Sequence, residues 1–136
     1  MKRTSTAIWE GSGKEGSGNL SSQSEILNNT PYSFSSRFEE GSGTNPEELI
    51  AAAHAGCFAM KLSFILGAAG YTPDKLEAKC EVTLDDGAIT SSQITLNASV
   101  PGIDEDTFAK SVKDAEENCP ISKVLSTNIS VDYTLS

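Results

Sequence analysis

The feature that most constrains the fold is one long, mostly apolar segment with strong signals at both ends. Asn45 can cap a helix there, and Pro46 suits the first helical position because that N–H would stay unpaired in any case. Two glutamates follow in the first turn, where the positive end of the helix dipole favours negative charge. The segment continues to Gly67 or Ala69 and ends near Gly70. We expect a single helix over this whole stretch.

Alternation of apolar and polar residues predicts strands before and after this helix. Tyr32, Phe34 and Phe38 would share one face of a third strand, with Arg37 on the other face. The Asp-Gly pair at 86–87 is a tight-turn signal that joins the two halves of a hairpin. Strands are expected at residues 4–10, 19–24, 32–38, 76–84, 94–100 and 129–135.

Two further helices complete the chain. Asp104 can cap a helix from Glu105 to about Asn118, and Pro120 begins a shorter one. The glycine- and serine-rich residues 11–18 fit a long hairpin loop better than a linker in so short a chain. Strands, helix, hairpin, helix and strand follow in order, which indicates an α+β fold with mostly antiparallel sheets.

Length and charge narrow the class of protein. A chain of 136 residues suits a single domain, residues 1–136, near the size at which a dimer adds stability. The net charge of -9 argues against nucleic acid and anionic membranes as partners. The start, MKRTSTAIWEG, lacks the apolar run of a signal peptide, and Lys61 interrupts the longest apolar segment, which argues against a membrane span. We expect a soluble, cytoplasmic protein.

Three cysteines carry most of the functional information. Cys57 lies deep within the long helix, and Cys119 lies where one helix ends and the next begins. Cys80 alternates with apolar residues of a strand and is expected to fill the core. An odd count of three is too small for a secreted disulfide framework, so two thiols far apart in the sequence suggest redox catalysis.

Either Cys57 or Cys119 could be the reactive thiol, because reactivity depends on what stabilises the thiolate. Cys119 directly precedes Pro120, and an N-cap position there would lower its pKa through the free N–H groups of the helix start. Cys57 has no such help in a helix interior and needs a cation from another segment, for which Arg37 and Lys14 are candidates. The residues alone do not rank the two thiols.

A purely structural explanation competes with a catalytic one. The small residues around Cys57 make a thin helix surface that a ligand could approach, and its bulky apolar neighbours would favour organic peroxides. The residues alone favour a core helix packed through its small side chains. His54 could tune the pKa of Cys57, yet a packing role is the simpler one. Zinc held by His54, Cys57 and Cys119 would lack the usual CxxC or HxxxH spacing, so we expect no metal.

Four segments together resemble the OsmC branch of the OsmC/Ohr family. They are PYSFSSRFEEGSGTNPEEL, TNPEELIAAAHAGCFAM, VPGIDEDTF and NCPISKVL, and the resemblance extends from about Trp9 to the C-terminus. It implies the OsmC/Ohr-like fold, in which antiparallel sheets pack around long central helices, and an intertwined homodimer with its active sites at the interface. It also implies a thiol-dependent peroxidase of stress defence that needs no flavin, haem or metal cofactor.

The resemblance assigns roles to four residues. Cys57 matches the peroxidatic cysteine and Cys119 the resolving one, while Glu47 matches the glutamate of the NPE motif. Arg37 resembles the arginine that faces the thiolate in this branch; the Ohr branch takes its arginine from nearer the N-terminus. The implied substrates are organic hydroperoxides and, less efficiently, hydrogen peroxide. The peroxide would oxidise Cys57 to a sulfenic acid, Cys119 would close a disulfide, and an external dithiol would reduce it. In relatives of the Ohr type this reductant is a lipoylated protein.

Two other classes of function stay open at this stage. One is a binding or sensing protein of the same fold that holds an apolar ligand without turnover, and the other is a dimeric stress protein with incidental redox activity. The presence of both cysteines together with Arg37 and Glu47 favours the enzyme over both.

Overall fold

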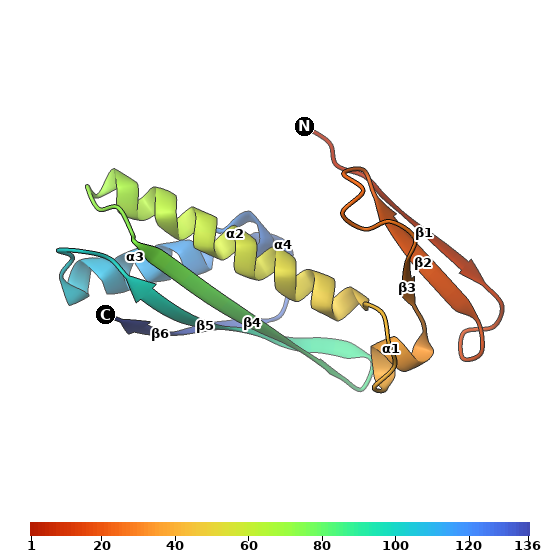
Figure 1. The fold of residues 1–136 in the computed structure, drawn as a ribbon. Coiled ribbons are helices and arrows are strands. Elements are labelled where there is room, and N and C mark those ends of the chain that lie inside the picture. Colours follow the sequence, from red (N-terminus) through yellow and green to blue (C-terminus); the bar gives the residue numbers. More distant parts are fainter. The chain divides into compact units, whose positions relative to one another are not determined.

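The structure, a computed structural model, describes residues 1–136, the whole chain. Six strands and four helices follow one another in the order β1, β2, β3, α1, α2, β4, β5, α3, α4, β6 (Figure 1). The chain divides into two compact units, Met1–Leu49 and Ile50–Ser136, with the boundary inside the first turns of α2. The single domain expected from the length stays a prediction.

The first unit contains a small antiparallel sheet in the order β1-β2-β3. Its strands are β1 (Ser5–Glu10), β2 (Ser17–Ser22) and β3 (Thr30–Tyr32). The loop between β1 and β2 confirms the predicted hairpin. Trp9 and Tyr32 pack over Gly18 with ring centroids 5.3 Å apart, and a Cβ at Gly18 would lie 2.6 Å from both rings. Glycine is therefore required where the two aromatic side chains close over the middle strand.

The predicted third strand is wrong beyond Tyr32, because Phe34–Phe38 forms the short helix α1. Ser33 and Ser36 build a capping box: the Ser33 hydroxyl accepts from the Ser36 N–H, and the Ser36 hydroxyl accepts from the Ser33 N–H. Two phenylalanines four residues apart fit a helix face as well as a strand face, and their rings lie 4.9 Å apart in α1. The serine cap decides between the two structures.

The second unit is built on the long helix α2 (Pro46–Ala68), whose predicted bounds are confirmed. It packs with a sheet in the order β4-β5-β6, formed by β4 (Lys75–Asp85), β5 (Ala88–Ser99) and β6 (Asn128–Leu135). The predicted Asp-Gly turn joins β4 to β5, and both of its residues have positive φ, 49° for Asp86 and 78° for Gly87.

One strand pair departs from the antiparallel pattern. Strands β5 and β6 are parallel, because the chain returns between them through α3 (Glu105–Asn118) and α4 (Pro120–Val124). A helical crossover of this kind brings the second strand back in the direction of the first. The other three strand pairs are antiparallel, so the predicted α+β class with mostly antiparallel sheets is confirmed.

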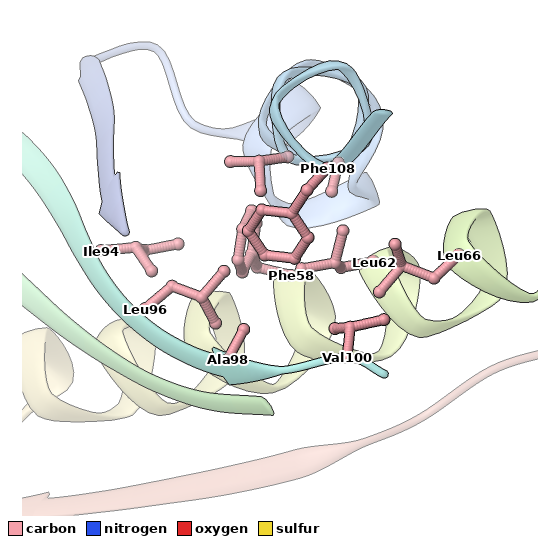
Figure 2. Packing of buried hydrophobic residues seen from close by; sticks show 10 residues of the cluster. Phe58, Leu62, Leu66, Ile94, Leu96, Ala98, Val100 and Phe108 are labelled. Carbon is pink, nitrogen blue, oxygen red and sulfur yellow. The ribbon is translucent and has the colours of Figure 1, made fainter. Parts of the chain in front are cut away.

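The core of the second unit lies between one face of this sheet and the helices α2 and α3. Figure 2 shows side chains from all three elements meeting in one cluster. Phe58 and Phe108, the two largest fully buried side chains, come from α2 and α3. The cluster consists of Phe58, Leu62, Leu66, Ile94, Leu96, Ala98, Val100, Phe108, Val112 and Ala115. This packing fixes the part of α2 that carries Cys57 against α3 and the turn that follows it.

Helix α2 is long and apolar enough to span a membrane by length and composition alone, so the expectation that Lys61 rules this out is wrong. A single helix of this kind is weak grounds for a membrane span, since core helices of soluble proteins pass the same test. Leu62 and Leu66 are fully buried in the core, whereas Met60 and Phe64 are 65% and 71% exposed. Helix α2 therefore carries apolar side chains on two faces, and the second unit covers only one of them.

Candidate active site

The sulfurs of Cys57 and Cys119, 62 residues apart in the sequence, lie 2.9 Å from each other and share a hydrogen bond. Helix α2 supplies Cys57, and the sharp break between α3 and α4 supplies Cys119. Both are free thiols. A small movement of either side chain would bring the sulfurs to the length of a disulfide, about 2.05 Å.

Cys119 caps two helices at once. It ends α3, where its N–H donates to the carbonyl of Ala115, and it occupies the N-cap of α4 before Pro120. Burial alone would raise the pKa of Cys119, but its hydrogen bond with Cys57 and those with Ser122 and the backbone of Ile121 outweigh burial and lower it. The predicted helix-cap position is confirmed.

For Cys57 the influences on the pKa add up in the opposite direction and raise it. Burial raises its pKa, and its hydrogen bond to Cys119 raises it further, while the N–H of Ile121 and the charge of Lys61 act in the lowering direction. The two thiols form one titrating pair, and within the second unit the negative charge favours Cys119. Solvent access favours the other thiol, because Cys119 is 0% exposed whereas Cys57 is only partly buried.

Arg37 and Glu47 form an ion pair within the first unit. Arg37 donates from both Nε and Nη2 to the same carboxylate oxygen, Oε1 of Glu47, at 3.1 and 3.0 Å. The other oxygen of Glu47, Oε2, is buried and has no hydrogen-bond partner. The structure thus brings together the arginine and the glutamate that the resemblance singled out, and leaves one acceptor of this pair unused.

An aromatic hollow of about 520 Å³ lies beside Arg37, also within the first unit. The guanidinium stacks over Phe38 at 5.1 Å, and the Lys14 ammonium lies 5.9 Å from the Phe34 ring. The hollow is lined by Trp9, Gly13, Lys14, Tyr32, Ser33, Phe34, Arg37 and Phe38. Apolar walls with two cations at the rim suit an apolar ligand that carries a polar or anionic end.

His54 takes part in a buried polar network that sequence reasoning missed. Its Nδ1 lies 2.6 Å from the hydroxyl of Ser92 and its Nε2 lies 2.8 Å from the hydroxyl of Ser122. Cys80 joins the network through its sulfur, 3.1 Å from the Ser92 oxygen. Ser92 lies on the inward face of β5, where the alternating pattern otherwise has apolar residues. Ser122 lies three residues after Cys119. A serine within an apolar alternation was the signal available in the sequence.

No group of three or more histidine, cysteine or acidic side chains gathers in a way that could hold a metal ion.

Burial raises the pKa of Cys80, although its hydrogen bond to Ser92 acts in the opposite direction.

A profile of OsmC-like proteins matches residues 39–134, a range that contains both thiols of the close pair and Glu47. The chain belongs to the OsmC family. It is 47% identical to the peroxiredoxin OsmC of Escherichia coli (strain K12) over 133 residues, which cover 95% of this chain and 93% of that protein. It is 37% identical to the organic hydroperoxide resistance protein of Xanthomonas axonopodis pv. citri over 103 residues, 71% of this chain and 69% of that protein.

Solved structures confirm the fold of this OsmC family member. An OsmC-like protein from Mycoplasma pneumoniae matches with a TM-score of 0.77 at 15% identity, covering 99% of this chain and 97% of that one. The organic hydroperoxide resistance protein OhrB of Bacillus subtilis matches with a TM-score of 0.64 at 25% identity, covering 98% of both chains. The predicted OsmC/Ohr-like fold is therefore confirmed.

Proposed function

We propose that this protein is a thiol-dependent peroxidase that reduces organic hydroperoxides through a cycle of its two close cysteines. The observation that carries the proposal is the 2.9 Å contact between two free thiols from distant parts of the chain. Relatives that share the fold and up to 47% of the sequence are a peroxiredoxin and organic hydroperoxide resistance proteins. A peroxidase explains why the fold brings two thiols from distant parts of the chain together.

The cycle uses only these two sulfurs, a peroxide and an external dithiol. The Cys57 thiolate attacks the distal peroxide oxygen, the O–O bond breaks, and the alcohol leaves after taking up a proton. Cys57 is then a sulfenic acid. The sulfur of Cys119 attacks the Cys57 sulfur, the S–O bond breaks, and the hydroxide leaves as water with the proton of the Cys119 thiol. A dithiol reduces the disulfide and is itself oxidised.

Access supports Cys57 as the sulfur that meets peroxide. It is partly exposed, whereas Cys119 is completely buried and contacts the Cys57 sulfur directly. The lower pKa of Cys119 suits a thiol that must attack the sulfenic acid as soon as it forms. What Cys57 lacks within its own unit is a cation strong enough to hold its thiolate.

Arg37 is the cation that we assign to this role, supplied by a second copy of the chain. Glu47 and Cys57 lie ten residues apart on one helix, which separates them by about 15 Å along its axis. The ion pair of Glu47 with Arg37 would therefore serve the thiol of the partner in a homodimer. Two observations support this arrangement: the unused buried oxygen of Glu47, and the uncovered apolar face of α2 with Met60 and Phe64. An unsatisfied buried acceptor costs roughly 1–3 kcal/mol, which a donor from the partner would recover.

The aromatic hollow beside Arg37 would then hold the organic part of the substrate. A hydroperoxide bound there would place its O–O group near the guanidinium while its hydrocarbon lies against Trp9, Tyr32 and Phe34. This arrangement favours organic hydroperoxides over hydrogen peroxide, which has nothing to bury. The reductant is a small or protein-bound dithiol, a lipoylated protein included. A cytoplasmic location agrees with a count of three cysteines, which is odd and too small for a disulfide framework.

The test is consumption of cumene hydroperoxide, tert-butyl hydroperoxide and hydrogen peroxide by the purified protein with excess dithiothreitol. We expect catalytic turnover of all three, with the two organic peroxides faster. The Cys80→Ser variant is the matched control and should consume peroxide as fast as the wild type, since Cys80 lies outside the pair. Binding of peroxide without consumption would contradict the proposal and indicate a binding protein instead.

A further inference from the structure

The side chain of Asn45 makes hydrogen bonds to two helices at once. Its Oδ1 accepts from the N–H of Glu48, 2.8 Å away, which is the predicted N-cap contact at the start of α2. Its Nδ2 donates to the carbonyl oxygen of Ser36 in α1, 3.1 Å away. One amide group therefore connects the helix that carries Arg37 with the helix that carries Glu47.

The carbonyl of Ser36 depends on this contact. Helix α1 has only five residues, so its last carbonyl groups have no partners within the helix. The N–H groups of Glu39 and Gly41 both donate to the carbonyl of Ser35, and neither returns to Ser36. Because Ser36 is a buried residue, an unpaired carbonyl there would be unfavourable. The amide of Asn45 thus closes the end of α1 as well as the start of α2.

The same two helices meet again at the ion pair. Arg37 directly follows Ser36, and Glu47 lies two residues after Asn45, so each member of the pair adjoins one end of the amide bridge. The Arg37 side chain is 41% exposed, whereas that of Glu47 is 10% exposed. A half-exposed arginine loses much side-chain entropy when it is held in one geometry, and an ion pair with water access holds it weakly. The pair therefore needs α1 and α2 to be fixed by other contacts.

We infer that Asn45 is a positioning residue for Arg37, because its amide fixes α1 against the first turn of α2 and so keeps both Arg37 hydrogen bonds to Glu47 in place. All three residues lie within the first unit. An N-cap by itself needs only an acceptor, which serine, threonine and aspartate also supply. Among these side chains only asparagine has an acceptor and a donor on separate atoms, and the structure uses both.

Thr44 provides a comparison within the same turn. Its N–H donates to the carbonyl of Pro31 at 3.0 Å, and its hydroxyl donates to Oε2 of Glu48 at 2.7 Å. These contacts hold the turn against β3 and against α2, and neither of them reaches α1. Removal of the Thr44 hydroxyl therefore takes one hydrogen bond from the turn while it leaves the bridge between Asn45 and Ser36 intact.

The role deepens the proposed function and rests on it only where Arg37 acts on a thiol. A guanidinium held at Nε and Nη2 presents its remaining N–H groups in a fixed direction, and these are the donors that could face the Cys57 thiolate. A loosened Arg37 should stabilise this thiolate less and slow its attack on peroxide. The contact between Cys57 and Cys119 should stay as it is.

Hydrogen exchange of the Arg37 side chain tests the inference without any peroxide. The chain has two arginines, Arg3 and Arg37, so a nitrogen-15 NMR spectrum contains two Nε–H signals. The Nε–H of Arg37 donates to Glu47, whereas Arg3 lies in the exposed N-terminal segment and donates only from Nη1, which makes its signal an internal reference. Arg37→Lys identifies the signal by removing it. The exchange rate in mildly acidic buffer reports how often the ion pair opens.

Two substitutions of Asn45 keep the cap of α2 and remove the link to α1. Asn45→Ser is a neutral cap whose side chain is too short to reach Ser36 as well, and Asn45→Asp has the size of asparagine but no donor. We expect each to exchange the Arg37 Nε–H roughly fivefold faster, the factor that corresponds to the loss of about one hydrogen bond. Circular dichroism should show unchanged helix content. The matched control, Thr44→Val, should exchange at the wild-type rate.

Asn45→Ser decides the outcome, and Asn45→Thr, a second neutral cap, takes its place if the serine variant does not fold. A wild-type exchange rate in this variant overturns the inference, and faster exchange in Asn45→Asp alone would then assign the effect to the added charge. The inference is also overturned if Thr44→Val speeds the exchange as much as Asn45→Ser does, because the effect would then belong to the whole turn.

The pH dependence of the peroxide reaction is the second measurement. The rate constant of Cys57 with tert-butyl hydroperoxide should fall roughly fivefold at neutral pH in Asn45→Ser, in proportion to the exchange, and its pH profile should move to higher pH. A loss of folded protein would lower the rate at every pH without moving the profile. Thr44→Val should follow the wild type. Faster exchange with an unmoved profile would support the positioning role and contradict the assignment of Arg37 to the thiol, so the two proposals fail separately.

Discussion

At the scale of single residues, the two thiols present a conflict between charge and access. The hydrogen bonds at the start of α4 favour a thiolate on Cys119, yet Cys119 is buried and Cys57 is the sulfur with partial exposure. Peroxide has to reach the sulfur that attacks it, so access decides the first step and charge the second. The conflict disappears once an arginine approaches Cys57, because a cation within about 4–6 Å lowers the pKa of a thiol as it does that of a carboxyl group.

Substitution of each cysteine separates these two steps. Cys57→Ser should lose all peroxide consumption, because it removes the sulfur that attacks oxygen. Cys119→Ser should consume about one equivalent of peroxide and accumulate a sulfenic acid that dimedone traps. Stopped-flow peroxide consumption and intact mass measure both results. Full activity of Cys57→Ser would contradict the mechanism, and a Cys119→Ser protein that never reacts with peroxide would reverse the two roles.

Cys80 should stay outside the chemistry despite its contact with the buried network. Burial raises its pKa, so the thiol stays neutral and reacts slowly. Peptide mapping after one equivalent of peroxide should find a disulfide between Cys57 and Cys119 and an alkylatable thiol at Cys80. A bridge to Cys80 in native protein would show that the network opens during the cycle.

At the scale of elements, helix caps and turn residues made much of the fold predictable. Asn45 with Pro46 marked the start of α2, Asp104 the start of α3, and the Asp-Gly pair the turn between β4 and β5. The short helix α1 escaped prediction because Phe34 and Phe38 satisfy both strand and helix periods. The parallel pairing of β5 and β6 is a property of the crossover, which no local pattern reveals.

The candidate site also has a part that the sequence predicts and a part that depends on how the helices pack. A thiol at a helix start could be recognised from CysPro alone, whereas the contact between Cys57 and Cys119 depends on how α2 packs against α3 and α4. The partners of His54 come from residues 38 and 68 positions away, so no spacing rule could have named them. Long-range contacts of this kind follow from the packed core.

The core contact that holds α2 in place gives a prediction at this scale. Phe58 is 0% exposed and belongs to the core cluster, so Phe58→Ala should leave a cavity in the core of the second unit and cost about 3–5 kcal/mol of unfolding free energy. Urea denaturation measures the loss. Ile26→Ala, at a side chain that is 87% exposed, is the control and should change stability by less than about 0.5 kcal/mol. A loss for Phe58→Ala no larger than the control would mean that α2 is held by other contacts.

At the scale of the whole molecule, a single chain has three features that a second copy of the chain would complete. The exposed side chains of Met60 and Phe64, four residues apart, mark one apolar side of α2. Glu47 keeps a buried oxygen without a partner. Arg37, the cation that we propose for Cys57, is bound to Glu47, ten residues before Cys57 on the same helix. One homodimer would resolve all three, with the Arg37–Glu47 pair of each subunit serving the thiols of the other.

Mixing two inactive variants tests this arrangement. Cys57→Ser lacks the reactive thiol, and Glu47→Ala lacks the carboxylate that holds Arg37, so each homodimer should be inactive or nearly so. If the ion pair acts across the dimer, a heterodimer has one site with both lesions and one site with neither. After subunit exchange in an equal mixture, random pairing would make about half of the dimers heterodimers, and peroxidase activity should recover to about a quarter of the wild-type value.

The control for this experiment comes from the thiol pair itself. Cys57 and Cys119 meet within one chain, so a heterodimer of Cys57→Ser and Cys119→Ser has one lesion in each site and should regain no turnover. Arg37→Met in place of Glu47→Ala should complement in the same way, because the two side chains act as one ion pair. Mass spectrometry under native conditions has to show that heterodimers form. Their formation without any recovery of activity would place Arg37 and Glu47 with the thiols of their own chain, or outside the reaction.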